Sequence, residues 1–298
     1  MSSLRIIGRN AGCRHAWPYP IRAQTVSAAW LAAVRLALDA PGHRLFHQVT
    51  QIEDPTAEDP AVRQAVDGLL ADLSLPPVET VANTIFPSGI AATSKSYEQL
   101  TERYRRLYPT LKRWPANVHG TYFGRLVAYP AAGQHIDQLA ELIRKLRTEL
   151  RTSVPKAARY EVNLAAPGET FPTPSPAANG TAFDASEKDA TVVAQPLPIH
   201  CPGQDTGAMA FPCLTFCSFQ LDGSFLHAVA HYRSQYLVQR AYGNYLGLGR
   251  LLHYVGEQTE LQVGELMVIG AYAQIDPKVP RPTLRTTIQS VPGMDPAI

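Results

Sequence analysis

The stretch FPCLTFCSFQLDGSFLHAVAHYRSQY, residues 211–236, is the part of the sequence that most restricts how the chain folds. Apolar and polar residues alternate on both sides of Asp222-Gly223, and an Asp-Gly pair between two such runs is a strong signal for a β-hairpin. The stretch therefore predicts two antiparallel strands joined by a tight turn. Cys213 and Cys217 both fall on the first strand, about 13 Å apart at roughly 3.3 Å per residue, which is too far for a disulfide.

Periodicity elsewhere predicts an α+β order of elements, with the strands concentrated in the second half of the chain. Helices are predicted over residues 25–40, 61–73, 96–108, 135–150 and 239–258. Residues 79–89 are typical of a short β-like or loop segment, and residues 265–275 of a further strand. We expect a single domain over residues 1–298, in which the Pro-, Gly- and Ser-rich residues 165–200 form a long loop or insertion.

The last predicted helix contains several glycines, at Gly243, Gly247, Gly249 and Gly256. An interior glycine destabilises a helix by about 1 kcal/mol relative to alanine. So many glycines in one helix therefore predict a close approach to another backbone or to a ligand.

Composition and charge argue against several classes of protein. Hydrophobic residues make up 45% of the chain and charged residues 17%, as in a soluble protein with a large core. No apolar run approaches the roughly 18 residues of a membrane span, and the N-terminus lacks a signal-peptide pattern, so we expect a cytoplasmic protein. The net charge of +2 is too small to indicate a nucleic-acid surface. The histidines and cysteines do not form a ligand set of familiar spacing, so no metal site is expected.

Each candidate residue has a simple structural interpretation when it is taken alone. Free cysteines such as Cys213 are usually buried and inert. Arg233 can be a strand arginine with an acidic partner, and Asn244 a buried packing amide. Gln274 and Asp276 can be ordinary polar residues near a strand end. The hypothesis of a functional site therefore depends on the spacing of these residues.

That spacing resembles the catalytic half of the thymidylate synthase family. Pro212-Cys213 opens a strand, Arg233-Ser234 follows twenty residues after the cysteine, and Asn244 comes eleven residues later.

Three further segments support the resemblance. LQVGE at residues 261–265 and GQHIDQL at residues 133–139 match family motifs, and YFGR at residues 122–125 stands where the family has an aromatic motif. Together the matching segments span about residues 120–276.

The resemblance implies both a fold and a reaction. The implied fold is a mixed β-sheet packed with helices, in which one face of the sheet forms a homodimer interface. In the implied reaction, the Cys213 thiolate adds to carbon 6 of a pyrimidine nucleoside monophosphate. Carbon 5 then attacks a one-carbon unit carried by 5,10-methylenetetrahydrofolate. The product would be a methylated or a hydroxymethylated nucleotide.

The resemblance also assigns contacts to the nucleotide. Arg233 and Ser234 would bind the phosphate, since the planar guanidinium fork suits phosphate oxygens. Arg159 matches one of two adjacent arginines that the family lends across the dimer, whereas the other position is Ala158. Asn244 would contact the carbonyl and N–H edge of the base; in the family, asparagine here goes with uracil.

The sequence departs from the family pattern at several positions. Leu214 replaces the histidine after the cysteine, and Tyr232 replaces the glutamine before the arginine. Tyr236 stands where an aspartate holds the folate, while Gln274 and Asp276 stand at the two positions that bind the sugar. Two hypotheses follow: a transferase with an altered folate pocket, or a catalytically degenerate homologue that binds a nucleotide as a sensor or partner protein.

Overall fold

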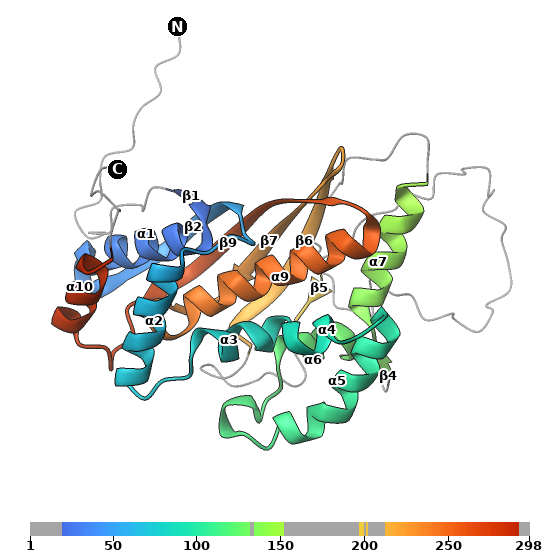
Figure 1. Cartoon of the computed structure of the whole chain (residues 1–298), viewed down its shortest axis with the longest axis horizontal. Coiled ribbons are helices and arrows are strands. Elements are labelled where there is room, and N and C mark those ends of the chain that lie inside the picture. The colour runs from blue at the N-terminus through green and yellow to red at the C-terminus, as the bar shows by residue number, and fades with distance from the viewer. Residues whose placement is uncertain (1–19, 132–133, 152–196, 200, 202–211, 292–298) are drawn as a thin grey trace, which may run out of the picture.

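The computed structural model of the chain describes residues 20–131, 134–151, 197–199, 201 and 212–291 (Figure 1). The regular elements are β1 (Ile21–Thr25), α1 (Val26–Asp39), β2 (Arg44–Asp54), α2 (Pro60–Asp72), α3 (Val78–Ile85), α4 (Ser88–Ala92), α5 (Tyr97–Leu111), α6 (Tyr122–Val127), β3 (Tyr129–Ala131), β4 (Gln134–Ile136), α7 (Gln138–Glu149), β5 (Leu197–Pro198), β6 (Leu214–Asp222), β7 (Phe225–Tyr232), β8 (Gln235–Tyr236), α9 (Tyr242–Thr259), β9 (Gln262–Gln274) and α10 (Arg281–Gln289). A wide π-type turn, Leu237–Ala241, joins β8 to α9.

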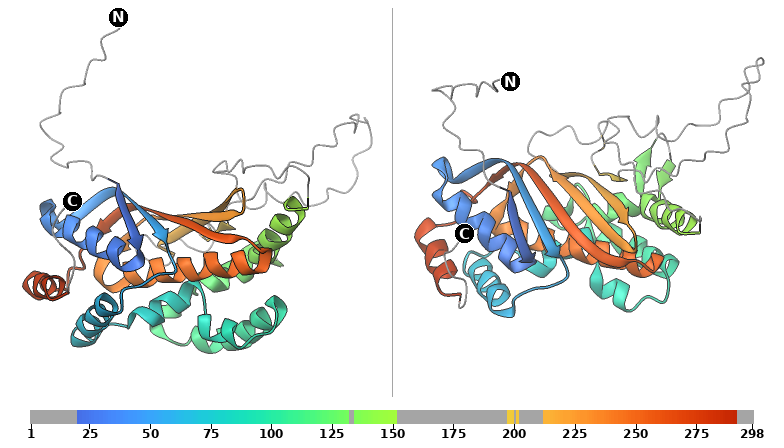
Figure 2. Two further views of the ribbon diagram at one scale, coloured as in Figure 1. Left: turned by 45° about the horizontal axis from the view of Figure 1, so that its top comes forward. Right: turned by 90° about the horizontal axis from the view of Figure 1, so that it is seen from above.

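The centre of the fold is a mixed seven-stranded sheet with the order β1-β2-β9-β7-β6-β5, in which β8 also pairs with β9. The pairs β1/β2 and β7/β9 are parallel, whereas β2/β9 and β6/β7 are antiparallel. The predicted α+β class is therefore confirmed. Figure 2 shows the helices gathered on one face of this sheet.

The hydrophobic core lies between that face and the helices. Ile52, Leu266, Ala228 and Phe219 form one row across four neighbouring strands, and all of them are buried. Helix α9 packs on β9 and β7, and α1 packs on β1 and β2, from the same side. Because one face of each strand is buried in this way, a slip of one residue in any pairing would expose the core row.

The predicted hairpin is confirmed. Strands β6 and β7 pair antiparallel, and the residues that join them are Gly223 and Ser224, because Asp222 pairs with Phe225 as the last residues of the two strands. Gly223 has a φ of +58°, which a residue with a β-carbon rarely adopts.

The prediction for the glycines of α9 is also confirmed. Because these residues have no side chain, the backbone of other segments lies close to the helix. A β-carbon at Gly247 would lie 2.7 Å from the carbonyl oxygen of Ala82 in α3, and one at Gly249 would lie 1.9 Å from that of Pro55. Helix α9 thus lies closer to α3 and to the segment after β2 than a larger residue at either glycine position would allow.

Two predictions from the sequence are wrong. Residues 79–89 contain most of helix α3 instead of a β-like segment, since Val78, Val81, Ala82 and Ile85 repeat at helical spacing and are all buried. Helix α5 continues past Pro109 to Leu111. A proline so close to the end removes at most one hydrogen bond of the last turn, so it does not stop the helix there.

The first half of the chain contributes more strands than the sequence predicted. Strand β1 and the eleven-residue β2 form one edge of the sheet. Of the expected insertion over residues 165–200, only 197–199 are described, and Leu197–Pro198 form a short strand beside β6. Within the part of the chain that the structure describes, no helix combines the length and apolar character that crossing a membrane requires.

The packing of α9 predicts the outcome of a glycine substitution. Gly249→Ala is expected to lower the free energy of unfolding by about 1–3 kcal/mol, because the new methyl group overlaps the Pro55 carbonyl. Urea denaturation measures this change. Gly68→Ala, in α2, is the matched control: nothing lies within 4 Å of its β-carbon position, so helix propensity alone should stabilise it by about 1 kcal/mol. Equal effects of the two substitutions would contradict the packing argument.

Candidate functional site

The hairpin places Cys213 directly beside Arg233. The amide N–H of Arg233 donates to the carbonyl oxygen of Cys213 at 2.9 Å, immediately beyond the last paired residues of β6 and β7. Both side chains are half-buried. The two residues that the sequence placed at the centre of the site, twenty positions apart, are therefore backbone neighbours.

Opposing effects act on the Cys213 thiol. Burial raises its pKa above the ordinary value, and the charges of Arg233 and Arg240 lower it. The net shift is upward, so the free protein holds a protonated thiol near neutral pH. Cys217 is fully buried with no charge acting on it, and burial raises its pKa to about 12. The structural interpretation therefore suits Cys217, while Cys213 is half-buried at the margin of the core, where the charges of two arginines act on it.

The structure adds Arg240 to the site, which the sequence analysis missed. This arginine lies on the π-type turn before α9 and is half-buried. Its charge acts on Cys213, although the two residues are 27 positions apart in the sequence. No local pattern indicates this proximity, because it depends on how β8 joins the sheet beside β9.

Tyr122 is the second residue that the structure adds. It begins helix α6, in the aromatic segment that the sequence analysis had noted without assigning it a role. Burial raises the pKa of its hydroxyl, the nearby Cys213 thiol raises it further, and the backbone N–H of Leu214 and the charge of Arg240 lower it. Tyr122, Cys213 and Arg240 therefore form one electrostatic cluster.

Asn244 lies on α9, one helical turn after Arg240. Its side chain is only 4% exposed, and its Oδ1 has no hydrogen-bond partner among the described residues. A buried amide oxygen without a partner is costly, by about 1–3 kcal/mol. This oxygen is therefore suited to accept a hydrogen bond from a bound molecule.

The remaining predicted ligand contacts lie along the end of the sheet. Ser234 is half-buried between β7 and β8, and Tyr236 pairs with Gln274 where β8 meets β9. The Tyr272 hydroxyl donates to Oε1 of Gln274 at 3.0 Å. Arg159 lies outside the described residues.

Asp276 has a structural partner that the sequence did not suggest. Its carboxylate accepts hydrogen bonds from the N–H groups of Val238, at 2.9 Å, and Gln239, at 3.3 Å. The side chain is 3% exposed, and burial raises its pKa, while these backbone bonds and the charge of Arg240 lower it. Asp276 thus anchors the start of the turn that presents Arg240.

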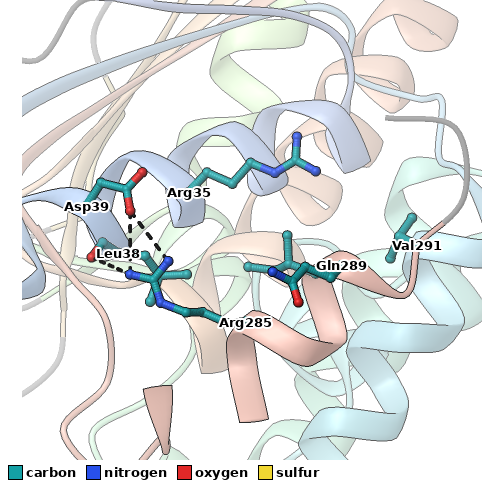
Figure 3. A pocket seen from close by; sticks show the side chains of 7 residues that line it. Arg35, Leu38, Asp39, Arg285, Gln289 and Val291 are labelled. Carbon is teal, nitrogen blue, oxygen red and sulfur yellow. Dashed lines mark hydrogen bonds and ion pairs between the residues drawn. The ribbon is translucent and has the colours of Figure 1, made fainter. Parts of the chain in front are cut away.

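A separate groove of about 400 Å³ lies between α1 and α10, lined by Arg35, Leu38 and Arg285 among others (Figure 3). It contains none of the residues around Cys213. Among the described residues, no group of three or more His, Cys, Asp or Glu side chains could hold a metal ion.

No family model matches the chain, and neither does any curated protein. The interpretation of the site therefore depends on its own geometry and electrostatics.

The opposing effects on Cys213 predict its reactivity toward iodoacetamide. Because the thiolate is the reacting form, the rate for Cys213 should reach half its maximum above the ordinary thiol pKa of about 8.5. Arg233→Gln should move this midpoint further up, since one lowering charge is lost. Peptide mass spectrometry over a pH series measures both values and should find Cys217 unmodified in the folded protein. Arg22→Gln, an exposed arginine of β1, is the control; a midpoint at or below 8.5 would refute the prediction.

Proposed function

We propose that this protein is a thymidylate synthase-like transferase that places a one-carbon unit on carbon 5 of a pyrimidine nucleoside monophosphate. The observation that carries the proposal is the pairing of Cys213 with Arg233 at the end of the hairpin, in a half-buried position that Arg240 and Tyr122 also approach. Such a concentration of a thiol, a phenol and two guanidinium groups is typical of a reactive site.

The proposed reaction begins with addition of the Cys213 sulfur to carbon 6 of the ring. Carbon 5 of a pyrimidine is a poor nucleophile, and the addition converts the ring into an enolate that attacks the one-carbon donor. The thiol must lose its proton first, because burial keeps it neutral in the free protein. The charges of Arg233 and Arg240 favour that loss.

The nucleotide contacts divide between a cationic end and a neutral end. Arg233 and Ser234 bind the phosphate in this proposal, together with Arg159 from the partner subunit. Asn244 accepts the ring N–H through its unpartnered Oδ1, which favours uracil. Gln274 contacts the sugar. Asp276, whose carboxylate already accepts two backbone N–H groups, would contact the sugar only through its remaining lone pairs.

The one-carbon donor of the proposal is 5,10-methylenetetrahydrofolate. Tyr236 takes the place of the acidic residue that holds the folate in the family. Its contact with the pterin would therefore differ from the carboxylate contact of the family. A tyrosine offers a ring face and one hydroxyl instead of a carboxylate. After the one-carbon unit joins carbon 5, that carbon would lose its proton and the folate amine would leave as its bond to the one-carbon unit breaks. The resulting methylene group would take a hydride from the tetrahydrofolate, which gives a methyl group and dihydrofolate, or water, which gives a hydroxymethyl group and tetrahydrofolate. Departure of the Cys213 sulfur from carbon 6 would then restore the ring.

A homodimer is part of the same proposal, and the sheet face opposite the helices supports it. Val229 and Met267 are neighbours on that face, next to Phe216, which stacks on His231 with an interplanar angle of 3°. All four side chains are half-buried in the single chain. The strand register puts them on the face opposite the buried row of Phe219, Ala228 and Leu266, and Figure 2 shows the helices gathered on one face of the sheet. A broad, partly apolar sheet face of this kind fits a second copy of the chain.

A second candidate function is that of a nucleotide-binding sensor without catalysis. The upward shift of the Cys213 pKa favours it, because a protonated thiol does not add to carbon 6. Leu214 and Tyr236 favour it as well, since each replaces a polar residue of the family's reaction site.

Tritium release distinguishes the two functions. With [5-³H]dUMP or [5-³H]UMP and methylenetetrahydrofolate, the transferase should release tritium into water as carbon 5 is substituted. Cys213→Ser should reduce the release at least a thousandfold, since the nucleophile is lost. Cys217→Ala, on the same strand but outside the site, should retain it. Nucleotide binding without release, unchanged in Cys213→Ser, would establish the sensor instead.

Analytical ultracentrifugation tests the homodimer. The wild-type chain should sediment as a dimer, and Met267→Lys should shift it to a monomer, because an unpaired charge buried in an interface costs several kcal/mol. Gln64→Lys, on the exposed side of α2, should leave the dimer intact. A monomeric wild type, or a Met267→Lys variant that remains dimeric, would rule out this face as the interface.

A further inference from the structure

The end of helix α5 and the turns that follow it carry a concentration of exposed apolar side chains. Trp114, Val118 and Leu107 are 67%, 52% and 46% exposed. The described part of the chain has one further exposed side chain of this kind, that of Phe225 beside the hairpin turn. Single exposed apolar residues are common on protein surfaces, whereas a group of them indicates an interaction site.

Backbone hydrogen bonds hold the three side chains on one compact series of turns. Leu107 lies one helical turn before Leu111, where α5 ends. The amide of Trp114 donates to the Leu111 carbonyl oxygen at 3.3 Å, and the amide of Asn117 donates to that of Trp114 at 2.8 Å. Val118 follows directly. Figures 1 and 2 show α5 on the far side of α9 from the sheet, so these turns form an outer edge of the molecule.

The same segment is strongly basic. From residue 103 to residue 136 the sequence contains six arginines and lysines and no aspartate or glutamate. Arg105 pairs with Asp137 at 2.8 Å, and Arg106 pairs with Glu102. Because the whole chain has a net charge of only +2, the end of α5 is a local positive region and not a share of a general basic surface.

Two of these cations lie next to the exposed tryptophan. Lys112 and Arg113 are both exposed, and neither has an acidic partner among the described residues. The ammonium nitrogen of Lys112 lies 5.9 Å from the centre of the Tyr108 ring. Cations suit the C-terminal end of a helix, where the dipole is negative. The exposed cations and the exposed apolar side chains together form a surface that we call the basic patch: Leu107, Lys112, Arg113, Trp114 and Val118.

Two classes of partner fit the basic patch less well. Single-stranded nucleic acids stack their bases on exposed aromatic rings. The tyrosines of α5 are turned inward, since Tyr104 is fully buried and Tyr108 packs against the core, which leaves the ring of Trp114 alone. A stable protein interface covers about 800 Å² on each partner and roughly 20–30 residues, more than one series of turns provides.

An anionic membrane surface matches both features of the basic patch. Segments that lie in the membrane interface combine tryptophan and aliphatic side chains with lysine and arginine. The apolar side chains leave water among the lipid headgroups, and the cations approach the lipid phosphates. Such binding needs no flat surface and no groove, because lipids rearrange around an inserted side chain.

We propose that the basic patch binds the surface of an anionic phospholipid membrane, with Trp114 inserted among the headgroups and with Lys112 and Arg113 beside the lipid phosphates. This inference goes beyond the proposed transferase function and does not depend on it. The patch lies on the helical side of the molecule, away from the sheet face proposed as the dimer interface, so both copies of a dimer would expose it (Figure 2).

Vesicle co-sedimentation tests the contribution of charge. The wild-type chain should bind vesicles that contain phosphatidylserine and should not bind vesicles of phosphatidylcholine alone. The double variant Lys112→Gln/Arg113→Gln should bind roughly 25-fold more weakly, because each cation near an anionic surface strengthens binding roughly fivefold. Arg22→Gln/Lys278→Gln removes two exposed cations elsewhere and lowers the net charge equally, so it should leave binding unchanged.

Fluorescence quenching tests insertion. The chain has three tryptophans, and in a Trp17→Phe background the buried Trp30 and the exposed Trp114 remain. Brominated acyl chains in the anionic vesicles should quench Trp114, and Trp114→Phe should abolish the quenching. Trp114→Ala should weaken binding roughly tenfold, because its apolar surface no longer leaves water. Phe225→Ala, the matched exposed apolar residue, should change neither quenching nor binding.

Three outcomes would overturn the inference. The first is a wild-type chain that binds anionic and neutral vesicles equally, or binds neither. The second is vesicle binding that does not respond to Lys112, Arg113 or Trp114. The third is binding of a single-stranded oligonucleotide, but not of vesicles, that these residues control, which would assign the basic patch to nucleic acid. Tritium release measured without vesicles should be the same in Lys112→Gln/Arg113→Gln as in the wild type, so the two proposals stand or fall separately.

Discussion

The antiparallel pairing of β6 with β7 is the interaction on which the rest of the candidate site depends. The two-residue connection at Gly223 and Ser224 sets the register, and this register brings the Arg233 amide to the Cys213 carbonyl. The same register turns Phe219 and Ala228 toward the helices. Because successive side chains on a strand point to opposite faces, a shift of one residue would disrupt the core as well as the site.

The second constraint is the position of helix α9, which its glycines allow to pack closely against other segments. Gly243 and Gly247 let the helix lie against the backbone of α3, and Gly249 lets it lie against Pro55. These contacts fix the position of the helix along the sheet. The Asp276 carboxylate accepts hydrogen bonds from the N–H groups of Val238 and Gln239, and so fixes the turn that leads into the helix. Together they determine where the turn and the helix hold Arg240 and Asn244, so these polar groups are positioned by contacts that lie outside the candidate site.

Sequence reasoning succeeded where the structural signal is local. The hairpin, the strand at residues 265–275 and most helices follow from turn residues and periodicity within short segments. It failed for residues 79–89, whose helical spacing of buried residues is present but is interrupted by polar ones. It also missed β1 and β2, since membership of a sheet depends on partners far along the chain.

The sequence by itself determined the hairpin, the identity of the thiol and the arginine at its end, and the need for close packing along α9. Each follows from residue types at short spacing, because turn geometry and missing β-carbons act locally. Only the tertiary structure decided that Arg240 and Tyr122 approach Cys213, that Asp276 anchors a turn, and that burial outweighs two positive charges at the thiol. Desolvation and charge act through space, and their strength depends on which distant segments pack around the sulfur.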